Sequence, residues 1–221
     1  MELLPQFIDI VLHLDKHLAI LLEQYGVWIY AILFAIVFCE TGLVVTPFLP
    51  GDSMLFVAGA LAATSEATGG NFNIGILMAT LVTAAVLGDN TNYWIGRWAG
   101  GKILRWGEGS RFFNRKAFDA THGFYEKYGG VTMLVARFMP FVRTFAPFVA
   151  GVGTMHYPRY VAFDTVGAVL WVGLLCGAGY LFGNLPWIKG NLSLVILGTI
   201  ALSLLPLVVA GIRARLAGAK A

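Results

Sequence analysis

Apolar residues occupy most of the chain and form long runs that short polar segments separate. The runs at 74–98, 160–182 and 191–212 each reach the roughly 20 residues that a helix needs to cross the hydrocarbon of a bilayer. We therefore predict a membrane-spanning helix in each run. Residues 1–25 differ, because large apolar residues recur there at helical spacing with charged residues between them. This pattern predicts an amphipathic helix that lies in the membrane interface and ends at Gly26.

A further apolar segment, residues 27–63, is interrupted in its middle. The interruptions are Gly42, Pro47, Pro50 and Gly51. Proline breaks the helical hydrogen-bond ladder, and at about 1.5 Å per residue the segment is too long for one crossing and too short for two. It also holds Glu40 and Asp52, although a carboxylate in hydrocarbon costs roughly 2.5–3.5 kcal/mol. We predict a helix and then a re-entrant hairpin at about 40–63, buried in protein or lining a wet cavity.

A second broken segment covers residues 131–154. Its interruptions are Arg137, Pro140, Arg143 and Pro147. Basic residues flank it on both sides, Lys127 before it and Arg159 after it, and basic residues favour the cytoplasmic side. A segment that enters and leaves from the cytoplasm fits this pattern better than a crossing does. We predict a second re-entrant hairpin at about 131–154.

The two broken segments share a short sequence, Phe-Val-Ala-Gly, at residues 56–59 and 148–151. Paired interruptions by glycine and proline in two halves of a chain indicate a transporter binding site near the middle of the membrane. If the first hairpin enters from outside and the second from inside, the two halves form an inverted repeat. The predicted fold is therefore an all-α polytopic membrane protein with two facing re-entrant hairpins.

Composition places the chain among membrane proteins. Hydrophobic residues make up 58% and charged residues only 12%, whereas soluble domains carry about 25% charged residues. The net charge of +3 is small, and the chain lacks the basic patch with interleaved aromatics that nucleic-acid binding requires. We predict one membrane domain over 26–212. The tryptophans, Trp171 among them, are interpreted as anchors at the membrane interface.

Charge also predicts the orientation. Residues 100–130 hold six lysines and arginines but three acidic residues, and residues 213–221 are basic as well. Because cytoplasmic loops carry an excess of lysine and arginine, both segments are predicted to be cytoplasmic.

Four short motifs occur in order along nearly the whole chain. They are Glu40–Leu43 with Pro47, Phe48–Asp52, Gly88–Asp89 with Tyr93, Gly96 and Arg97, and Arg137–Thr144 with Pro140 and Arg143. Together they resemble the DedA family, which is related to eukaryotic lipid scramblases with the same core domain. The resemblance implies transport of undecaprenyl phosphate back across the bacterial inner membrane. Carried over by position, the functional acidic pair of the family falls on Glu40 and Asp52, and its functional arginines on Arg137 and Arg143.

The chemistry of these four residues is consistent with that role. Arginine offers planar, permanently charged donors that can replace the hydration of a lipid phosphate. Buried charges must also be paired, so we expect Arg137 and Arg143 to face Glu40 and Asp52 across the two hairpin tips. Protonation of Glu40 or Asp52 would then release an arginine, a hypothesis that links transport to the proton-motive force. It predicts that Glu40→Gln abolishes the pH dependence of transport. Residues predicted to line the same cavity are Pro47, Pro50, Gly51, Asp89, Asn92, Tyr93, Arg97 and Pro140, although Asp89, Asn92 and Arg97 stand near a helix end and could equally lie at the membrane interface.

Other functions remain open at this level. The same buried charges could serve a proton- or ion-coupled antiporter of a small solute, a broader phospholipid scramblase, or static salt bridges that clamp the hairpins. A lipid phosphatase needs a histidine nucleophile in a Ser-Gly-His type segment, and the sequence has none. We therefore expect a transporter and not an enzyme, without a metal or other cofactor, whose partners are the membrane, a polyprenyl phosphate and protons.

Overall fold

The computed structural model describes residues 14–42, 51–106, 129–153 and 155–183, together with 123, 185 and 198. Within these ranges the structure has the α-helices α2 (Leu14–Tyr25), α3 (Trp28–Gly42), α4 (Gly51–Ala67), α5 (Ile74–Trp106), α7 (Val131–Ala136), α8 (Pro140–Val152) and α9 (Tyr157–Phe182). Several predictions lie outside the described residues. They concern residues 1–13, Pro47, Pro50, most of the basic loop, the tail 213–221 and, apart from residue 198, the predicted helix 191–212.

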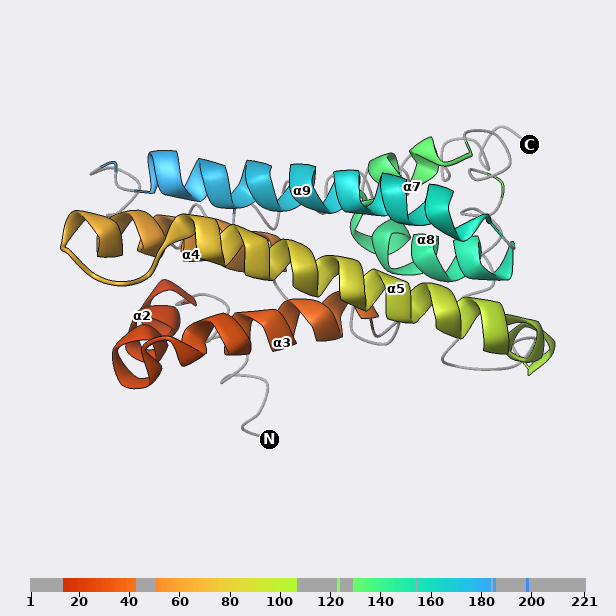
Figure 1. Ribbon diagram of the computed structural model, residues 1–221, viewed down its shortest axis with the longest axis horizontal. Coiled ribbons are helices and arrows are strands. Elements are labelled where there is room, and N and C mark those ends of the chain that lie inside the picture. The colour runs from red at the N-terminus through yellow and green to blue at the C-terminus, as the bar shows by residue number, and fades with distance from the viewer. Residues whose placement is uncertain are drawn as a thin grey trace, which may run out of the picture.

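Helix α5 runs through the length of the described part, with α3 on one side and α9 on the other (Figure 1). The segments Ile74–Ala99 and Tyr157–Phe182 are long and apolar enough to cross a membrane, as predicted for two of the three runs. Helix α5 continues to Trp106, however, so the predicted boundary at residue 98 was wrong. The glycines near residue 100 do not end it, because glycine costs a helix only about 1 kcal/mol and no proline follows them. The first residues of the predicted basic loop are therefore helical.

The other boundaries follow local chemistry. Helix α2 ends at Tyr25 because Gly26 adopts a positive φ of 52°, as the sequence predicts. Helix α9 begins at Tyr157 and not at 160, because His156 before it is extended. A proline stands in the first turn, where backbone N–H groups have no partner within the helix, so the missing N–H of proline breaks no hydrogen bond.

The described helices end and start near the predicted breaks, but the interruption predicted at Pro147 was wrong, because Pro147 lies inside α8. Helix α3 ends at Gly42 and α4 starts at Gly51, while α7 ends at Ala136 and α8 starts at Pro140. Met139 is extended, with φ −112° and ψ 109°, because the proline that follows it disfavours the helical conformation. At about 1.5 Å per residue, none of these four helices reaches the roughly 30 Å of a hydrocarbon core. The re-entrant and inverted arrangement stays a prediction.

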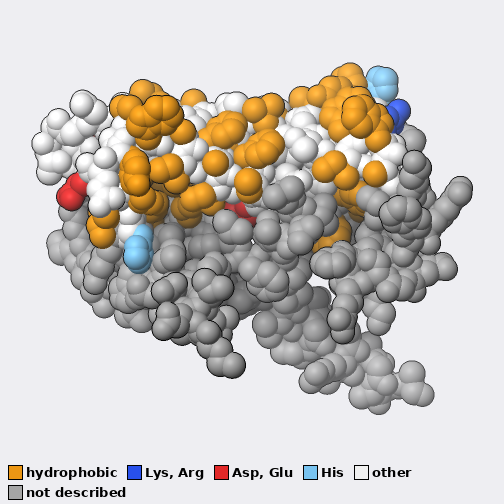
Figure 2. Space-filling view, turned by 90° about the horizontal axis from the view of Figure 1, so that it is seen from below, with side chains coloured by type: hydrophobic (Ala, Val, Ile, Leu, Met, Phe, Trp, Pro, Cys, Tyr) orange, Lys and Arg blue, Asp and Glu red, His pale blue; other side chains and the backbone are white. Residues whose placement is uncertain are grey.

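The outer surface of the described helices is largely apolar. Figure 2 shows hydrophobic side chains over much of the described part of one face, with few charged side chains among them. Helix α9 contributes exposed Val166, Leu170, Leu174 and Leu181. Such a surface would be costly in water and suits lipid.

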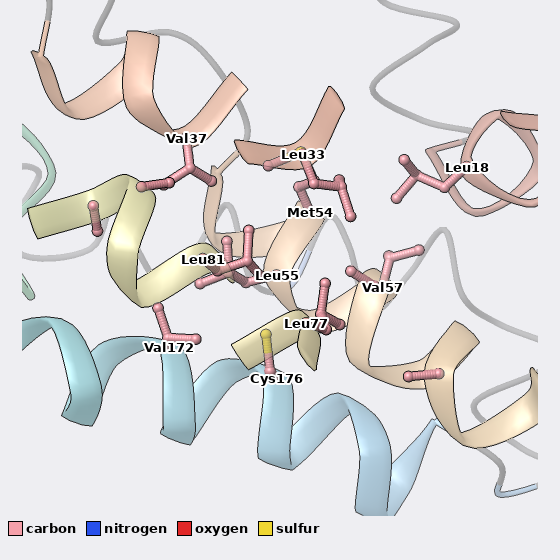
Figure 3. Packing of buried hydrophobic residues seen from close by; sticks show 14 of the residues in the cluster. Leu18, Leu33, Val37, Met54, Leu55, Val57, Leu77, Leu81, Val172 and Cys176 are labelled. Carbon is pink, nitrogen blue, oxygen red and sulfur yellow. The ribbon is translucent and has the colours of Figure 1, made fainter. Parts of the chain in front are cut away.

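Beneath this surface, buried apolar residues form two clusters. The larger cluster joins α3, α4, α5 and α9 through residues such as Leu33, Leu55, Leu81 and Val172 (Figure 3). The smaller one includes Tyr93, Met133, Ala146 and Tyr160 from α5, α7, α8 and α9. The cavity described below is lined by residues of both clusters, Trp171 of the larger one and Met133, Ala136 and Ala146 of the smaller one.

The repeated Phe-Val-Ala-Gly segments occupy equivalent packing positions. On α4, a Cβ at Gly59 would lie 2.2 Å from the Cys176 carbonyl oxygen of α9. On α8, a Cβ at Gly151 would lie 2.1 Å from the Tyr93 carbonyl oxygen of α5. Each short helix therefore packs, backbone against backbone, on a long helix from the other half of the chain, and small residues permit this close approach.

Candidate functional site

The four charged residues singled out in the sequence lie at helix ends that converge. Glu40 is in the last turn of α3, and Asp52 is in the first turn of α4. Arg137 directly follows α7, and Arg143 is in the first turn of α8. The breaks in the two apolar segments thus bring charges from opposite halves of the chain together.

Arg143 binds both predicted carboxylates. Its Nη1 donates to Asp52 Oδ1 at 2.7 Å, and its Nη2 donates to Glu40 Oε1. The side chains are 14% exposed for Arg143, 19% for Asp52 and 1% for Glu40. The predicted pairing across the two broken segments is therefore confirmed for Arg143.

Trp171 of α9 completes this ionic cluster. Its indole Nε1 donates to Asp52 Oδ1 at 3.0 Å, and the Arg143 guanidinium carbon lies 5.3 Å from the centre of its ring. The interpretation of Trp171 as an interfacial anchor was wrong, because this side chain is buried and contacts both charges.

Arg137 has different partners from those predicted. Its Nη2 donates to Asp89 Oδ2, and its Nη1 donates to Asp164 Oδ1 at 3.0 Å and to the Asp164 carbonyl oxygen at 3.2 Å. The predicted pairing with Glu40 or Asp52 was wrong, because α7 packs on α9 and Gly167 leaves room there for the arginine stem. Asp164 was missed. A lone aspartate in the apolar run 160–182 carries the same desolvation penalty that marked Glu40, and this signal could have found it.

Both arginines line a small cavity of about 20 Å³, which has room for about one water molecule. Its charged lining residues are Glu40, Asp89, Arg137, Arg143 and Asp164, and its other lining residues include Thr41, Met133, Thr144, Pro147 and Trp171. Two carboxylate oxygens in this lining, Glu40 Oε2 and Asp164 Oδ2, are buried without a hydrogen-bond partner.

Some of the residues predicted to line the cavity do lie at it, and others do not. Asp89 lines the cavity. Gly51 adjoins it, since a Cβ there would lie 2.0 Å from Glu40 Oε2. Arg97 is exposed, and its assignment to the cavity was wrong: it lies two helical turns beyond Asp89 on α5. Pro140 contributes the start of α8.

Asn92 and Tyr93 are buried beside the cavity and bind backbone groups. Asn92 Nδ2 donates to the Thr144 carbonyl oxygen of α8 at 2.7 Å and to the Thr41 carbonyl oxygen of α3 at 3.5 Å. Tyr93 Oη donates to the Met155 carbonyl oxygen at 2.7 Å. Asn92 therefore ties α5 to both broken segments at once.

Comparison with known proteins connects this arrangement to a family. Residues 49–181 match the VTT domain. Protein DedA of Escherichia coli (strain K12) is 52% identical over 221 residues, which cover 100% of this chain and 99% of that protein. A membrane protein of Mycobacterium leprae is 45% identical over 175 residues, covering 79% and 76% of the two chains. The Inner membrane protein YqjA of Escherichia coli (strain K12) is 32% identical over 189 residues, covering 84% and 81%.

No solved structure matches the chain. The sequence match nevertheless extends over the full length, and the matched domain holds Asp52, Asp89, Arg137, Arg143 and Asp164. The chain belongs to the DedA family of VTT-domain membrane proteins.

Proposed function

We propose that the protein translocates undecaprenyl phosphate across the bacterial inner membrane. The observation that carries this proposal is the state of Arg143, whose two terminal nitrogens each bind a different carboxylate inside a largely buried site. A guanidinium with two parallel donor positions suits phosphate oxygens as well as carboxylates. Glu40 and Asp52 thus hold positions that phosphate oxygens could take.

The small cavity supports an exchange mechanism. A volume of about 20 Å³ does not admit a phosphate group, so the described conformation is closed. For phosphate to reach Arg143, α8 must separate from the ends of α3 and α4. The phosphate then replaces the carboxylates one bond at a time, and the guanidinium stays paired throughout. This matters because an unpaired buried charge costs several kcal/mol.

The apolar surface provides a place for the lipid chain. Helix α9 carries Asp164 and Trp171 on its buried side and Leu170 and Leu174 on its exposed side. A polyprenyl chain can remain in the membrane against such a surface while the phosphate moves through the polar interior. Transport of this kind makes no covalent change, so the protein acts as a transporter and not as an enzyme.

The test is transport by purified protein in proteoliposomes that contain labelled undecaprenyl phosphate. We expect the wild type to accelerate exchange between the leaflets and Arg143→Ala to fall to the rate of empty liposomes. Arg143→Lys keeps the charge but loses the planar fork, so an intermediate rate is expected. Arg159→Ala is the matched control, because Arg159 is exposed. No acceleration by the wild type would overturn the proposal, and equal acceleration of common phospholipids would indicate a broader scramblase.

A second candidate is a proton- or ion-coupled antiporter of a small solute. The size of the cavity favours it, since about 20 Å³ suits a small ion better than a lipid headgroup. Proton flux under an imposed pH gradient, in vesicles without undecaprenyl phosphate, separates the two. Flux that depends on an added ion and not on the lipid would favour the antiporter.

A further inference from the structure

Asp89 and Asp164 share the guanidinium of Arg137. Their side chains are 6% and 0% exposed, and each binds a different nitrogen of that guanidinium. Two buried carboxylates that bind adjacent nitrogens of one guanidinium repel each other when both are ionised, because like charges at one site disfavour full ionisation. One proton on the pair relieves this repulsion.

The surrounding charges point the same way. Arg137 and Arg143 are two positive groups, whereas Glu40, Asp52, Asp89 and Asp164 are four acidic groups, so full ionisation leaves a net charge of −2. A buried excess of negative charge is relieved when carboxyl groups take up protons. The phenol of Tyr160 also faces this region, and it is neutral in its ordinary state.

The carboxyl groups around Arg143 and those around Arg137 differ in how far they are removed from solvent, and this decides where the excess of negative charge costs most. Asp52 is partly exposed, and its Oδ1 accepts hydrogen bonds from both Arg143 and Trp171. Asp164 is fully buried, and its Oδ2 has no partner although it lines the cavity. Both carboxyl groups of the Asp89 and Asp164 pair are thus buried, whereas one carboxyl group bound to Arg143 is partly exposed, so a proton relieves the excess of negative charge at the Asp89 and Asp164 pair.

We propose that Asp89 and Asp164 together form a proton-binding site, which holds one proton between two carboxyl groups at the side of the cavity. The sequence alone had directed attention to Glu40 and Asp52 for this role. Loss of the proton makes the pair doubly negative and holds Arg137 more firmly, whereas uptake of a second proton releases Arg137 into the cavity. If the protein also translocates a lipid phosphate, as proposed above, this site links proton uptake to an arginine that is free to bind phosphate.

Infrared spectroscopy tests the site without any transport measurement. Full-length protein in lipid nanodiscs without undecaprenyl phosphate should show, at neutral pH, the C=O stretch of a buried protonated carboxyl group, shifted in D₂O. Glu40→Gln is the matched control, because it removes an equally buried carboxyl group from the same cavity, whose Oε2 also lacks a partner. The part of the band that belongs to Asp89 and Asp164 should remain in Glu40→Gln. We expect Asp164→Asn to lose that part, because the variant removes one of the two like charges and leaves Asp89 alone beside Arg137.

The outcomes are distinct. A band that is unchanged in Asp164→Asn, or one that disappears entirely in Glu40→Gln, would overturn the proposal, as would its absence from the wild type. Asp89→Asn serves as the second variant if Asp164→Asn does not fold, and it should lose the band as well. A wild type that shows the band but moves no lipid would support the proton site and refute the proposed transport. In a wild type that does transport, Asp164→Asn should flatten the pH profile more than Glu40→Gln does.

Discussion

Replacement of Arg143 by glutamine removes the guanidinium that two buried carboxylates share. Its two hydrogen bonds join α8 to α3 and to α4, so the change acts where both halves of the chain meet. Removing one partner of a buried ion pair costs about 3–5 kcal/mol, because the other charge stays buried and uncompensated. Glu40, with 1% of its side chain exposed, bears most of this penalty, whereas Asp52 keeps its bond from Trp171. We expect Arg143→Gln to lower the free energy of unfolding by about 3–5 kcal/mol, out of a total of roughly 5–15 kcal/mol.

A second substitution tests the cause. Glu40→Gln in the Arg143→Gln background removes the uncompensated carboxylate, so the double variant should be more stable than the two single effects would predict. Residues within one ionic network typically show coupling of about 0.5–3 kcal/mol. Denaturant titration in mixed micelles, followed by tryptophan fluorescence, measures all four proteins, and Arg159→Gln serves as the exposed control. A loss below about 1 kcal/mol, or strictly additive effects, would refute the reasoning.

Two further predictions concern the surroundings of the site. Gly51→Ala places a Cβ 2.0 Å from a carboxylate oxygen and should cost about 1–3 kcal/mol by crowding, whereas Gly173→Ala meets nothing within 4 Å and should be neutral or stabilising; equal losses in the same titration would contradict this. Hydrogen bonds from the Tyr180 hydroxyl and, to a smaller extent, the Ile74 backbone N–H lower the pKa of Glu66 below its usual value of 4.5. A carboxyl group with a lowered pKa in the folded protein stabilises the fold at pH values above its ordinary pKa, and this stability is lost as the pH falls through the lowered pKa. Tyr180→Phe should therefore have a smaller free energy of unfolding than the wild type near neutral pH. The difference between the two proteins should narrow in acid. A gap that stays constant down to about pH 3 would show that the bond to the ionised carboxylate is not its cause.

The breaks in the apolar segments were predictable because they depend on local chemistry. Met139 before Pro140 is extended as expected, because a proline disfavours the helical conformation of the residue before it, although Pro147 lies inside α8 and does not end it. The charges of the site were predictable for a similar reason. A carboxylate or guanidinium in an apolar run must be buried with a partner or wetted in any fold, which marked Glu40, Asp52 and Arg143 correctly.

The choice of partners was not predictable. Arg137 and Arg143 lie six residues apart, yet one binds Asp89 and Asp164 while the other binds Glu40 and Asp52. That division follows from the packing of α7 on α9 and of α8 on α5 and α3, contacts between segments far apart in the chain. Trp171 has the same explanation, since an aromatic residue in an apolar run fits an interface or a buried site equally well until its neighbours are known.

By itself the sequence thus determined that the chain is a membrane protein with two broken segments and a few charges that had to be satisfied. A long apolar run carries its charged residues into the membrane or the protein interior, where each of them needs a partner or water, and the sequence displays such runs. Only the tertiary structure decided which charges satisfy one another, that Asp164 joins them, and that acidic groups outnumber arginines in one small cavity. The pairing of charges and the lining of the cavity depend on which sides of the helices contact each other. Side-chain packing between segments far apart in the chain determines those contacts.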